Sequence, residues 1–461
     1  MNNDTIKLLN LEGKNIDLTK SHVDKVNGEL VCTIVLNNTT KCCKDCGSTS
    51  ICSHGYTPKK ITHSISTNQP CILNYRARRF RCKDCGKTFL EHNPFCQKDE
   101  KLSLYTDIKI MEKLRSHTST FTSVAKDFNV SVQTVVNVFD NYASSSRLPL
   151  DEAICIDEIY TNKLTKKKYS CVIMNFKTKQ VIDLYPSRLK YDLEDNFMRI
   201  PLEERKQVKY VIIDMWDTYK QVSLSVFPNA IVAVDSFHVI KHLNLAIDMI
   251  RLKVMRKYDK GHSKLENAEM YYYMLKKFHY FFTKNYDNIY DGNIKVHKLH
   301  TSWDKHEIRK YLLEIDTDLN YAYNLKQEYQ EFNLAAKYET CDEELDKLIN
   351  DFRTSHLKEF REFGKLLNHW RTEIKNSFIK IDAYTTDKKT NEIISIKKRL
   401  SNGPMEGGNS RIKCIIKNAN GYKNFDRFRK RVLFSINKNT PIRSNNKSKD
   451  KDNDNNKNKD K

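Results

Sequence analysis

The spacing of apolar residues predicts that the chain begins with a small β domain. Over residues 1–98, short apolar runs alternate with turn residues, which is typical of short strands. Val31–Leu36 and Cys71–Phe80 are the clearest of these runs. The first domain is therefore predicted to consist of strands and turns.

A three-helix segment is predicted next. Between residues 103 and 143 the apolar residues recur every three or four positions, as they do on one face of a helix. Ser131 suits the start of the third helix, and Asn129 tolerates the left-handed backbone of a tight turn before it. This order predicts a helix-turn-helix over residues 99–145.

From Ala153 onward the pattern changes to that of an α/β domain. Three apolar strands in succession suit an antiparallel meander, and a helical stretch at about 189–200 separates them from two short buried strands. Three strands, a helix and then strand–helix units is the order of an RNase H-like core. The predicted strands are Ile154–Tyr160, Tyr169–Phe176, Gln180–Leu184, Tyr210–Ile213 and Ala230–Val234, and a helix follows through Ser236–Met255.

A large all-helical insertion is predicted within this core, at about residues 256–390, because apolar residues repeat there at helical spacing. After it, Ser401-Asn402-Gly403-Pro404 predicts a helix start and Asn420-Gly421 its end. The last segment, residues 439–461, is rich in Asn, Lys and Asp and is predicted to be disordered. The catalytic domain is thus predicted over residues 146–438, in a multidomain α+β chain.

The net charge of the chain indicates what kind of partner it binds. The net charge is +22, and the tail contributes only a small part of it. A strongly basic folded region favours a nucleic-acid partner, through phosphate contacts and counterion release. Part of the excess positive charge has an alternative explanation, since a composition heavy in Lys and Asn can simply reflect an AT-rich genome.

The cysteines predict a zinc site. Nine of the 13 cysteines lie before residue 97, and the pentapeptide Cys-Lys-Asp-Cys-Gly occurs twice. Two such knuckles supply four thiolates, which is what a closed, tetrahedral structural zinc site needs. Cys42 is an alternative to the first ligand, and free intracellular thiols are the alternative to a metal. The predicted ligands are Cys43, Cys46, Cys82 and Cys85, and the basic residues expected to meet phosphates beside them are Arg76, Arg78, Arg79, Arg81 and Lys83.

Three carboxylates are candidates for a catalytic metal site. Asp157 and Asp214 each end an apolar β run, and Glu406 lies in the first turn of the helix after Pro404. Carboxylates that converge from two strand ends and a helix can hold two divalent ions about 3.5–4 Å apart at a phosphodiester. Magnesium or manganese suits such oxygen ligands. A helix-capping or turn-forming role is the alternative for each residue, and the competing acids nearby are Glu158, Asp217 and Asp235.

Three blocks of sequence carry a resemblance that runs over nearly the whole chain before the tail. It resembles the transposases of the ISL-three insertion-sequence family, bacterial enzymes of the DDE class. Gly408 and Ser410 depart slightly from that family, in which a more polar run is usual. The blocks are Arg78–Phe89; Asp214–Tyr219 with Phe227–Ala230 and Asp235–Val239; and Ser401–Gly403 through Glu406–Lys413, closing on Gly421–Phe425.

The resemblance implies roles for particular residues. It makes Asp157, Asp214 and Glu406 the catalytic triad that binds magnesium. Asp235 and His238 become secondary catalytic candidates, for which a structural Asp–His pair is the alternative. Arg411, Lys413 and Lys417 are candidates to hold DNA phosphates beside the site, or are simply solvated charges. Trp370 is either a base-stacking residue or, as its helical spacing favours, a core residue.

The expected function follows from these parts. The zinc ribbon and the helix-turn-helix would bind the terminal inverted repeats of an insertion sequence, and the core would cut the DNA strand and join it to target DNA, with two or more protomers on the DNA. A non-catalytic DNA-binding regulator and a structure-selective nuclease are the alternatives. No apolar run approaches the roughly 20 residues of a membrane span, so the expected location is the bacterial cytoplasm, at the nucleoid.

Overall fold

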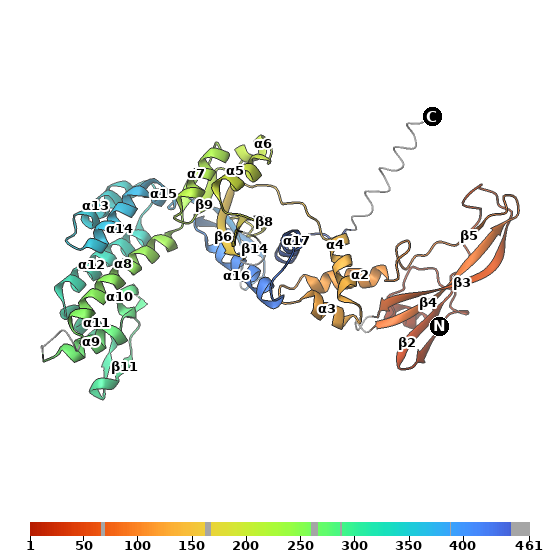
Figure 1. Cartoon of the computed structure of the whole chain (residues 1–461), viewed down its shortest axis with the longest axis horizontal. Coiled ribbons are helices and arrows are strands. Elements are labelled where there is room, and N and C mark those ends of the chain that lie inside the picture. The colour runs from red at the N-terminus through yellow and green to blue at the C-terminus, as the bar shows by residue number, and fades with distance from the viewer. Residues whose placement is uncertain (66–69, 162–166, 260–265, 286–287, 388, 444–461) are drawn as a thin grey trace. The chain divides into compact units, whose positions relative to one another are not determined.

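The computed structural model describes residues 1–65, 70–161, 167–259, 266–285, 288–387 and 389–443. It divides into two compact units. The first joins residues 1–146 to the chain from Ser410 onward, and the second is Arg147–Asn409. The predicted disordered tail lies mostly beyond the described residues. Figure 1 labels the elements of both units.

A five-stranded sheet forms the N-terminal part of the first unit, after the short helix α1 (Asn3–Leu8). Its long strands β3 and β4 form an antiparallel hairpin that accounts for most of the sequence between the two cysteine knuckles. The predicted β domain is thus confirmed, with an extended hairpin inside it. The strands are β1 (His22–Val26), β2 (Glu29–Ile34), β3 (Ile51–Ser64), β4 (Pro70–Cys82) and β5 (Thr88–Leu90).

The predicted helix-turn-helix is present as α2 (Leu104–Leu114), α3 (Phe121–Asp127) and α4 (Val132–Tyr142). The Ser131 side chain caps α4 by accepting from the backbone N–H of Thr134 at 3.0 Å. Asn129 has φ 51°, the left-handed conformation that the turn requires. Both local predictions about the turn are therefore confirmed.

The C-terminal helix α17 (Phe425–Ile436) belongs to the same compact unit as the helix-turn-helix. Phe434 packs among the buried residues of α2–α4, with its ring centroid 6.0 Å from that of Phe139. Arg431 is 1% exposed, and its guanidinium donates to backbone carbonyls in the α2–α3 connection. The chain after residue 409 thus packs with the helix-turn-helix in the first compact unit.

The second unit contains a mixed five-stranded sheet in the order β10-β9-β6-β7-β8. β6, β7 and β8 form the predicted antiparallel meander, while β9 and β10 run parallel to β6. This is the strand order of an RNase H-like core, as predicted. The bounds are β6 (Ala153–Tyr160), β7 (Tyr169–Asn175), β8 (Val181–Tyr185), α5 (Lys190–Met198), α6 (Leu202–Lys206), β9 (Tyr210–Ile213), α7 (Asp217–Val226) and β10 (Ile231–Val234).

The insertion is mainly helical but not entirely so. Two hairpins correct the all-helical prediction: β11 (Asn293–Val296) with β12 (Thr301–Asp304), whose strands are too short for periodicity to reveal, and β13 (Lys380–Thr386) with β14 (Ile393–Arg399), of which β13 lies within the predicted bounds. Trp370 is 3% exposed in the core, which favours packing over base stacking. The other elements are α8 (Ser236–Lys257), α9 (Ala268–Lys277), α10 (Tyr280–Thr283), α11 (Lys305–Glu314), α12 (Thr317–Ala335), α13 (Cys341–Thr354), α14 (Lys358–His369), α15 (Arg371–Asn376) and α16 (Gly403–Asn418).

Packing inside the insertion yields a stability prediction. A Cβ added at Gly364 on α14 would lie 2.7 Å from the backbone N of Arg353 on α13, so Gly364→Ala must push two helices apart. We expect it to lower the free energy of unfolding by about 1–3 kcal/mol, despite the better helix propensity of alanine. Gly407→Ala in α16 is the matched control, because nothing lies within 4 Å of the added Cβ. Chemical denaturation that ranks Gly364→Ala as stable as Gly407→Ala would contradict this close packing.

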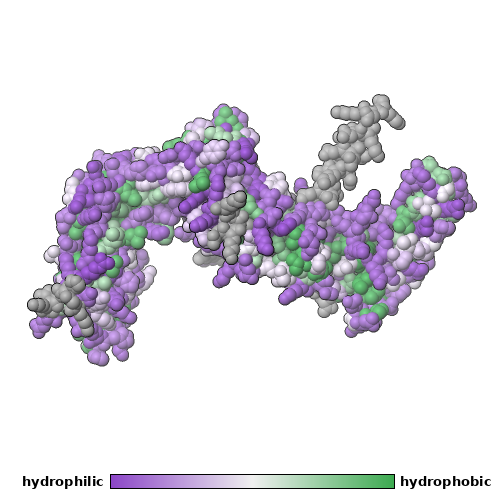
Figure 2. Space-filling view, viewed as in Figure 1, coloured by the Kyte–Doolittle hydropathy of each residue, from purple (hydrophilic) through white to green (hydrophobic). Residues whose placement is uncertain are grey.

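Hydrophilic residues cover most of the face drawn in Figure 2. In the part of the chain that the structure describes, no helix combines the length and apolarity needed to span a membrane.

Candidate active site and metal centre

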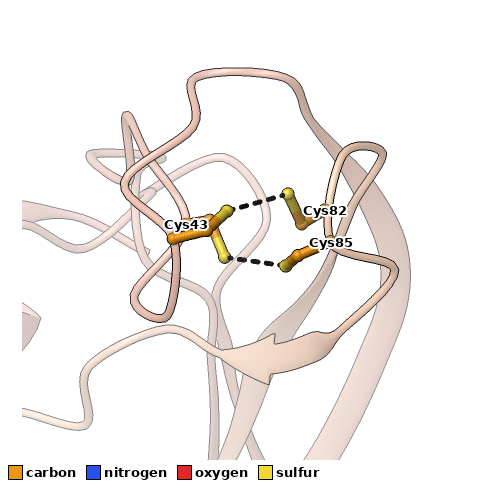
Figure 3. A group of neighbouring side chains, drawn as sticks. Cys43, Cys82 and Cys85 are labelled. Carbon is orange, nitrogen blue, oxygen red and sulfur yellow. Dashed lines mark hydrogen bonds between the residues drawn. The ribbon is translucent and has the colours of Figure 1, made fainter.

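The four predicted zinc ligands lie together at one end of the β3–β4 hairpin. The Sγ atoms of Cys43 and Cys85 are 3.7 Å apart, and those of Cys46 and Cys82 are 3.6 Å apart. Figure 3 shows the sulfurs of Cys43, Cys82 and Cys85 facing one another. A tetrahedral zinc with Zn–S bonds of about 2.3 Å requires S···S separations of about 3.8 Å. The cluster therefore fits a structural zinc.

The knuckle backbones explain why these thiols converge. Gly47 and Gly86 both have positive φ, 74° and 69°, which glycine adopts at little cost in a tight turn. A backbone hydrogen bond from Cys85 lowers the pKa of Cys82 to about 7, whereas the neighbouring thiols raise the pKa of Cys46, and the pKa of Cys85 is also raised. Cys42 is exposed and lies outside the four-sulfur cluster, so the structure prefers Cys43 as the first ligand.

The basic residues beside the zinc cluster do not all reach solvent. Arg78 is 8% exposed, and its guanidinium donates to the Leu36 carbonyl at 3.3 Å and to the Tyr56 hydroxyl at 3.5 Å. These contacts engage Arg78 inside the domain, which argues against its predicted phosphate contact. The exposed cations of the predicted set are Arg76, Arg79, Arg81 and Lys83.

The acidic site lies on three neighbouring parallel strands, with Asp157 inside β6 and Asp214 and Asp235 directly after β9 and β10. Cys155 on β6 pairs with Ile212 on β9. The same register, two residues further along both strands, places Asp157 beside Asp214. Pairing of Val234 with Ile213 on β10 and β9, continued for one residue, places Asp235 on the other side of Asp214. The sheet register therefore aligns three carboxylates along one edge.

Burial strongly affects these carboxylates. Burial, followed by the nearby charge of Asp214, raises the pKa of Asp157 to about 7. Burial also raises the pKa of Asp214, although His238 and a hydrogen bond from Asn402 oppose the shift. Two carboxylates in a shared low-dielectric site repel each other, and a cation between them relieves that repulsion.

His238 lies directly against this edge. Its Nδ1 is 3.1 Å from an oxygen of Asp214 and 3.4 Å from an oxygen of Asp235. Ligand atoms of these three residues lie within 4.8 Å of one another. The structure thus brings both secondary candidates next to Asp214, because Asp235 is the N-cap of α8 and His238 lies in its first turn.

Asn402, the residue before helix α16, and Asn409 on that helix supply two side chains that the sequence prediction did not assign to the site. Asn402 donates to Asp214 at 3.0 Å, and Asn409 donates to Asp157 at 2.6 Å. The Oδ1 atoms of both asparagines are buried without a hydrogen-bond partner. Positions 402, 406 and 409 share one helix face, and this spacing was the available sequence signal.

Glu406 lies between these two asparagines on the same face of α16. Its side chain is exposed, and among the described residues it is outside the compact group of possible metal ligands around Asp214. A Cβ added at Gly408 would meet the flexible end of the Met174 side chain on β7, so Gly408 lies where α16 packs against the sheet.

The competing acids have other partners. Glu158 forms an ion pair with Arg188 at 2.7 Å, and Asp217 lies 2.7 Å from His369 Nε2. The predicted phosphate-binding residues of α16 reach solvent in different degrees: Lys413 and Lys417 are exposed, and Arg411 is half-buried.

Comparisons with known proteins agree with this architecture. The family model described as a transposase of the ISL3 DDE type matches residues 154–386 and 381–432. The helix-turn-helix domain of transposase family ISL3 matches residues 91–143. The chain is also 24% identical over 215 residues to the "Transposase for insertion sequence element IS1001" of Bordetella parapertussis, covering 46% of this chain and 52% of that protein. It thus spans about half the length of this relative. The chain belongs to the ISL3 family of transposases.

Proposed function

We propose that this protein is an active transposase that cuts the ends of an insertion sequence and joins them to target DNA. The observation that carries the proposal is the acidic edge itself. The sheet register places Asp157, within β6, beside Asp214, which follows β9, and Asn402 before α16 and Asn409 on α16 donate to these two carboxylates. Such an edge suits phosphoryl transfer, in which positioning and charge stabilisation do most of the work.

Asp157, Asp214 and Glu406 would hold the catalytic divalent ions, magnesium or manganese. The fit rests on the two buried carboxylates and on the unpartnered Oδ1 atoms of Asn402 and Asn409, since hard cations prefer oxygen ligands. When bound, the ions would activate water or a 3′-hydroxyl and stabilise the leaving oxygen. Glu406 shares a helix face with both asparagines, which supports it as the third carboxylate.

The remaining side chains of the edge would orient these ligands. The amide groups of Asn402 and Asn409 fix the carboxylates that accept from them. His238 and Asp235 would hold Asp214 from its other side, as an imidazole held between two carboxylates can. We therefore assign Asp235 and His238 positioning roles and leave the metal to the triad.

The first compact unit would recognise the DNA. The zinc ribbon and the helix-turn-helix lie in this unit, and α4 would read the major groove of the terminal repeat. Arg76, Arg79, Arg81 and Lys83 would add phosphate contacts that position the protein without reading sequence. Two element ends require at least two protomers, so we also propose a homo-oligomer on DNA.

A joining assay tests this function. The purified protein is incubated with duplexes that carry the element end, together with a supercoiled target and Mg²⁺ or Mn²⁺. We expect a strand cut at the element end and joined products in the target. Binding without cutting would instead support the regulator, and cutting without joining would support the nuclease.

The zinc site has its own test. Cys85→Ser should lower the bound zinc from one equivalent towards zero and loosen the β3–β4 domain, because structural zinc contributes directly to folding. Metal content by atomic emission and limited proteolysis measure both effects. The control is Cys42→Ser, which alters the neighbouring exposed thiol outside the cluster. Equal loss of zinc in both variants would show that the ligand set is wrong.

A further inference from the structure

A cavity of about 780 Å³ lies within the first compact unit, between strand β3 and the helices α2 and α4. Its size falls within the roughly 300–1,000 Å³ of small-molecule sites. The walls are held by direct contacts, since the backbone N–H of Thr62 on β3 donates to the Lys101 carbonyl at 2.7 Å. The proposed cutting and joining chemistry does not use this cavity, although α4, which lines one wall of it, is also the helix proposed to read the major groove.

The cavity contains a buried carboxylate with one oxygen to spare. Asp107 is 1% exposed, and its Oδ2 accepts from the Tyr142 hydroxyl at 3.1 Å. Its Oδ1 is also buried and has no hydrogen-bond partner. Burying an acceptor without a hydrogen-bond donor is unfavourable, so a donor from a ligand would stabilise it. The hydrogen bond from Tyr142 therefore satisfies only one of the two carboxylate oxygens of Asp107.

The charged residues around the cavity determine which sign of ligand charge it favours. Asp107, Glu100 and Asp140 line it, and Lys101 is the one cation among its lining residues, all of which lie in the described part of the chain. Asp140 already pairs with Arg427 at 2.7 Å, which leaves two carboxyl groups facing the cavity. In a chain of net charge +22 this acidic recess would repel phosphate and attract a cation.

The other lining groups select the kind of cation. Leu102, Val130 and Val138 offer apolar surface, which suits methylene groups. Hydroxyl and amide groups alternate with them and can accept from several N–H donors. These groups belong to Ser131, Thr134, Asn137 and Asn141 on or beside α4.

We propose that this cavity binds an aliphatic diamine or polyamine, with one ammonium group donating to Asp107 Oδ1 and the methylene chain lying against the apolar wall. Burial raises the pKa of Asp107 to about 7 and also raises that of Glu100. An ammonium group beside these carboxyls would offset that cost of ionisation. The site is independent of the acidic edge, so its failure would leave the proposed transposase function untouched.

Calorimetry on the full-length protein without DNA tests the proposal with two matched probes. We expect 1,6-diaminohexane and spermidine to bind, and 1,6-hexanediol, which has the same methylene chain without charge, to bind at least tenfold more weakly. Asp107→Asn should weaken diamine binding at least tenfold. Asp127→Asn, on an exposed acid of α3, should leave it unchanged.

A second variant covers the case in which Asp107→Asn fails to fold. Asn141→Leu narrows the cavity from α4 at a half-buried position and should also weaken diamine binding. Absence of diamine binding to the wild type would overturn the proposal. Equal affinity of the wild type for 1,6-hexanediol and 1,6-diaminohexane would overturn it as well. So would wild-type affinity for the diamine in both Asp107→Asn and Asn141→Leu.

Discussion

Replacing Asp157 or Asp214 by asparagine, or Glu406 by glutamine, should abolish cleavage of element ends while leaving DNA binding nearly intact. Each substitution keeps the shape of the side chain and removes a charge that would hold a divalent ion. Metal ions supply several kcal/mol to reactions of this kind, which corresponds to a rate loss of about 10³-fold or more. Single-turnover cleavage of a labelled end measures the loss, and gel shift measures binding.

Asp217→Asn is the matched control for these variants. Asp217 lies three residues after Asp214 but contacts His369 on the insertion, and more than half of its side chain is exposed. We expect this variant to cut at close to the wild-type rate. Full activity in Glu406→Gln would remove Glu406 from the triad, and an inactive Asp217→Asn would show that the assay reports general damage.

The second large effect is expected at Arg431, which belongs to the first compact unit. This buried guanidinium donates to the carbonyls of Ser116 and Ser119 at 2.9 and 2.8 Å, and also to that of Leu114. Arg431→Met fills similar space but leaves buried carbonyls without a donor, at a cost of about 3–5 kcal/mol. We expect faster hydrogen exchange across α2–α4 and loss of terminal-repeat binding.

Lys430→Met provides the control for that prediction, because it removes a neighbouring cation from the same helix. Its amides across α2–α4 should exchange like those of the wild type. A stronger form of the same test deletes α17 altogether, which also removes Phe434 from the helix-turn-helix core. Retained repeat binding by a chain that ends before Phe425 would contradict a structural role for α17 in the DNA-binding unit.

The sequence predicted most elements of the core because each had a simple local signal. The buried strands β6, β7 and β9 are continuous apolar runs, and the turn at Asn129 and the cap at Ser131 follow from local backbone preferences. The repeated pentapeptide likewise indicated Cys43 over Cys42 before any geometry was known. Such signals depend on neighbours in sequence, which a single chain reveals directly.

The features that the sequence did not predict depend on contacts between distant segments. Asn402 and Asn409 meet carboxylates more than 180 residues away, and the pairing of Arg431 with the α2–α3 connection spans more than 300 residues. The burial of Arg78 is a similar case, because its neighbours in sequence are exposed cations. Charge and periodicity alone could not distinguish a cation that meets DNA from one that holds the fold together.

If Asp157, Asp214 and Glu406 cut DNA through bound metal, no covalent bond to the protein forms. Mapping the products of a labelled element end after reaction with the wild-type protein tests this mechanism. We expect one cut that leaves a free 3′-hydroxyl at the element end, requires Mg²⁺ or Mn²⁺, and leaves no protein on the denatured DNA. Cleavage that persists in EDTA, or a protein–DNA adduct that survives denaturation, would contradict it.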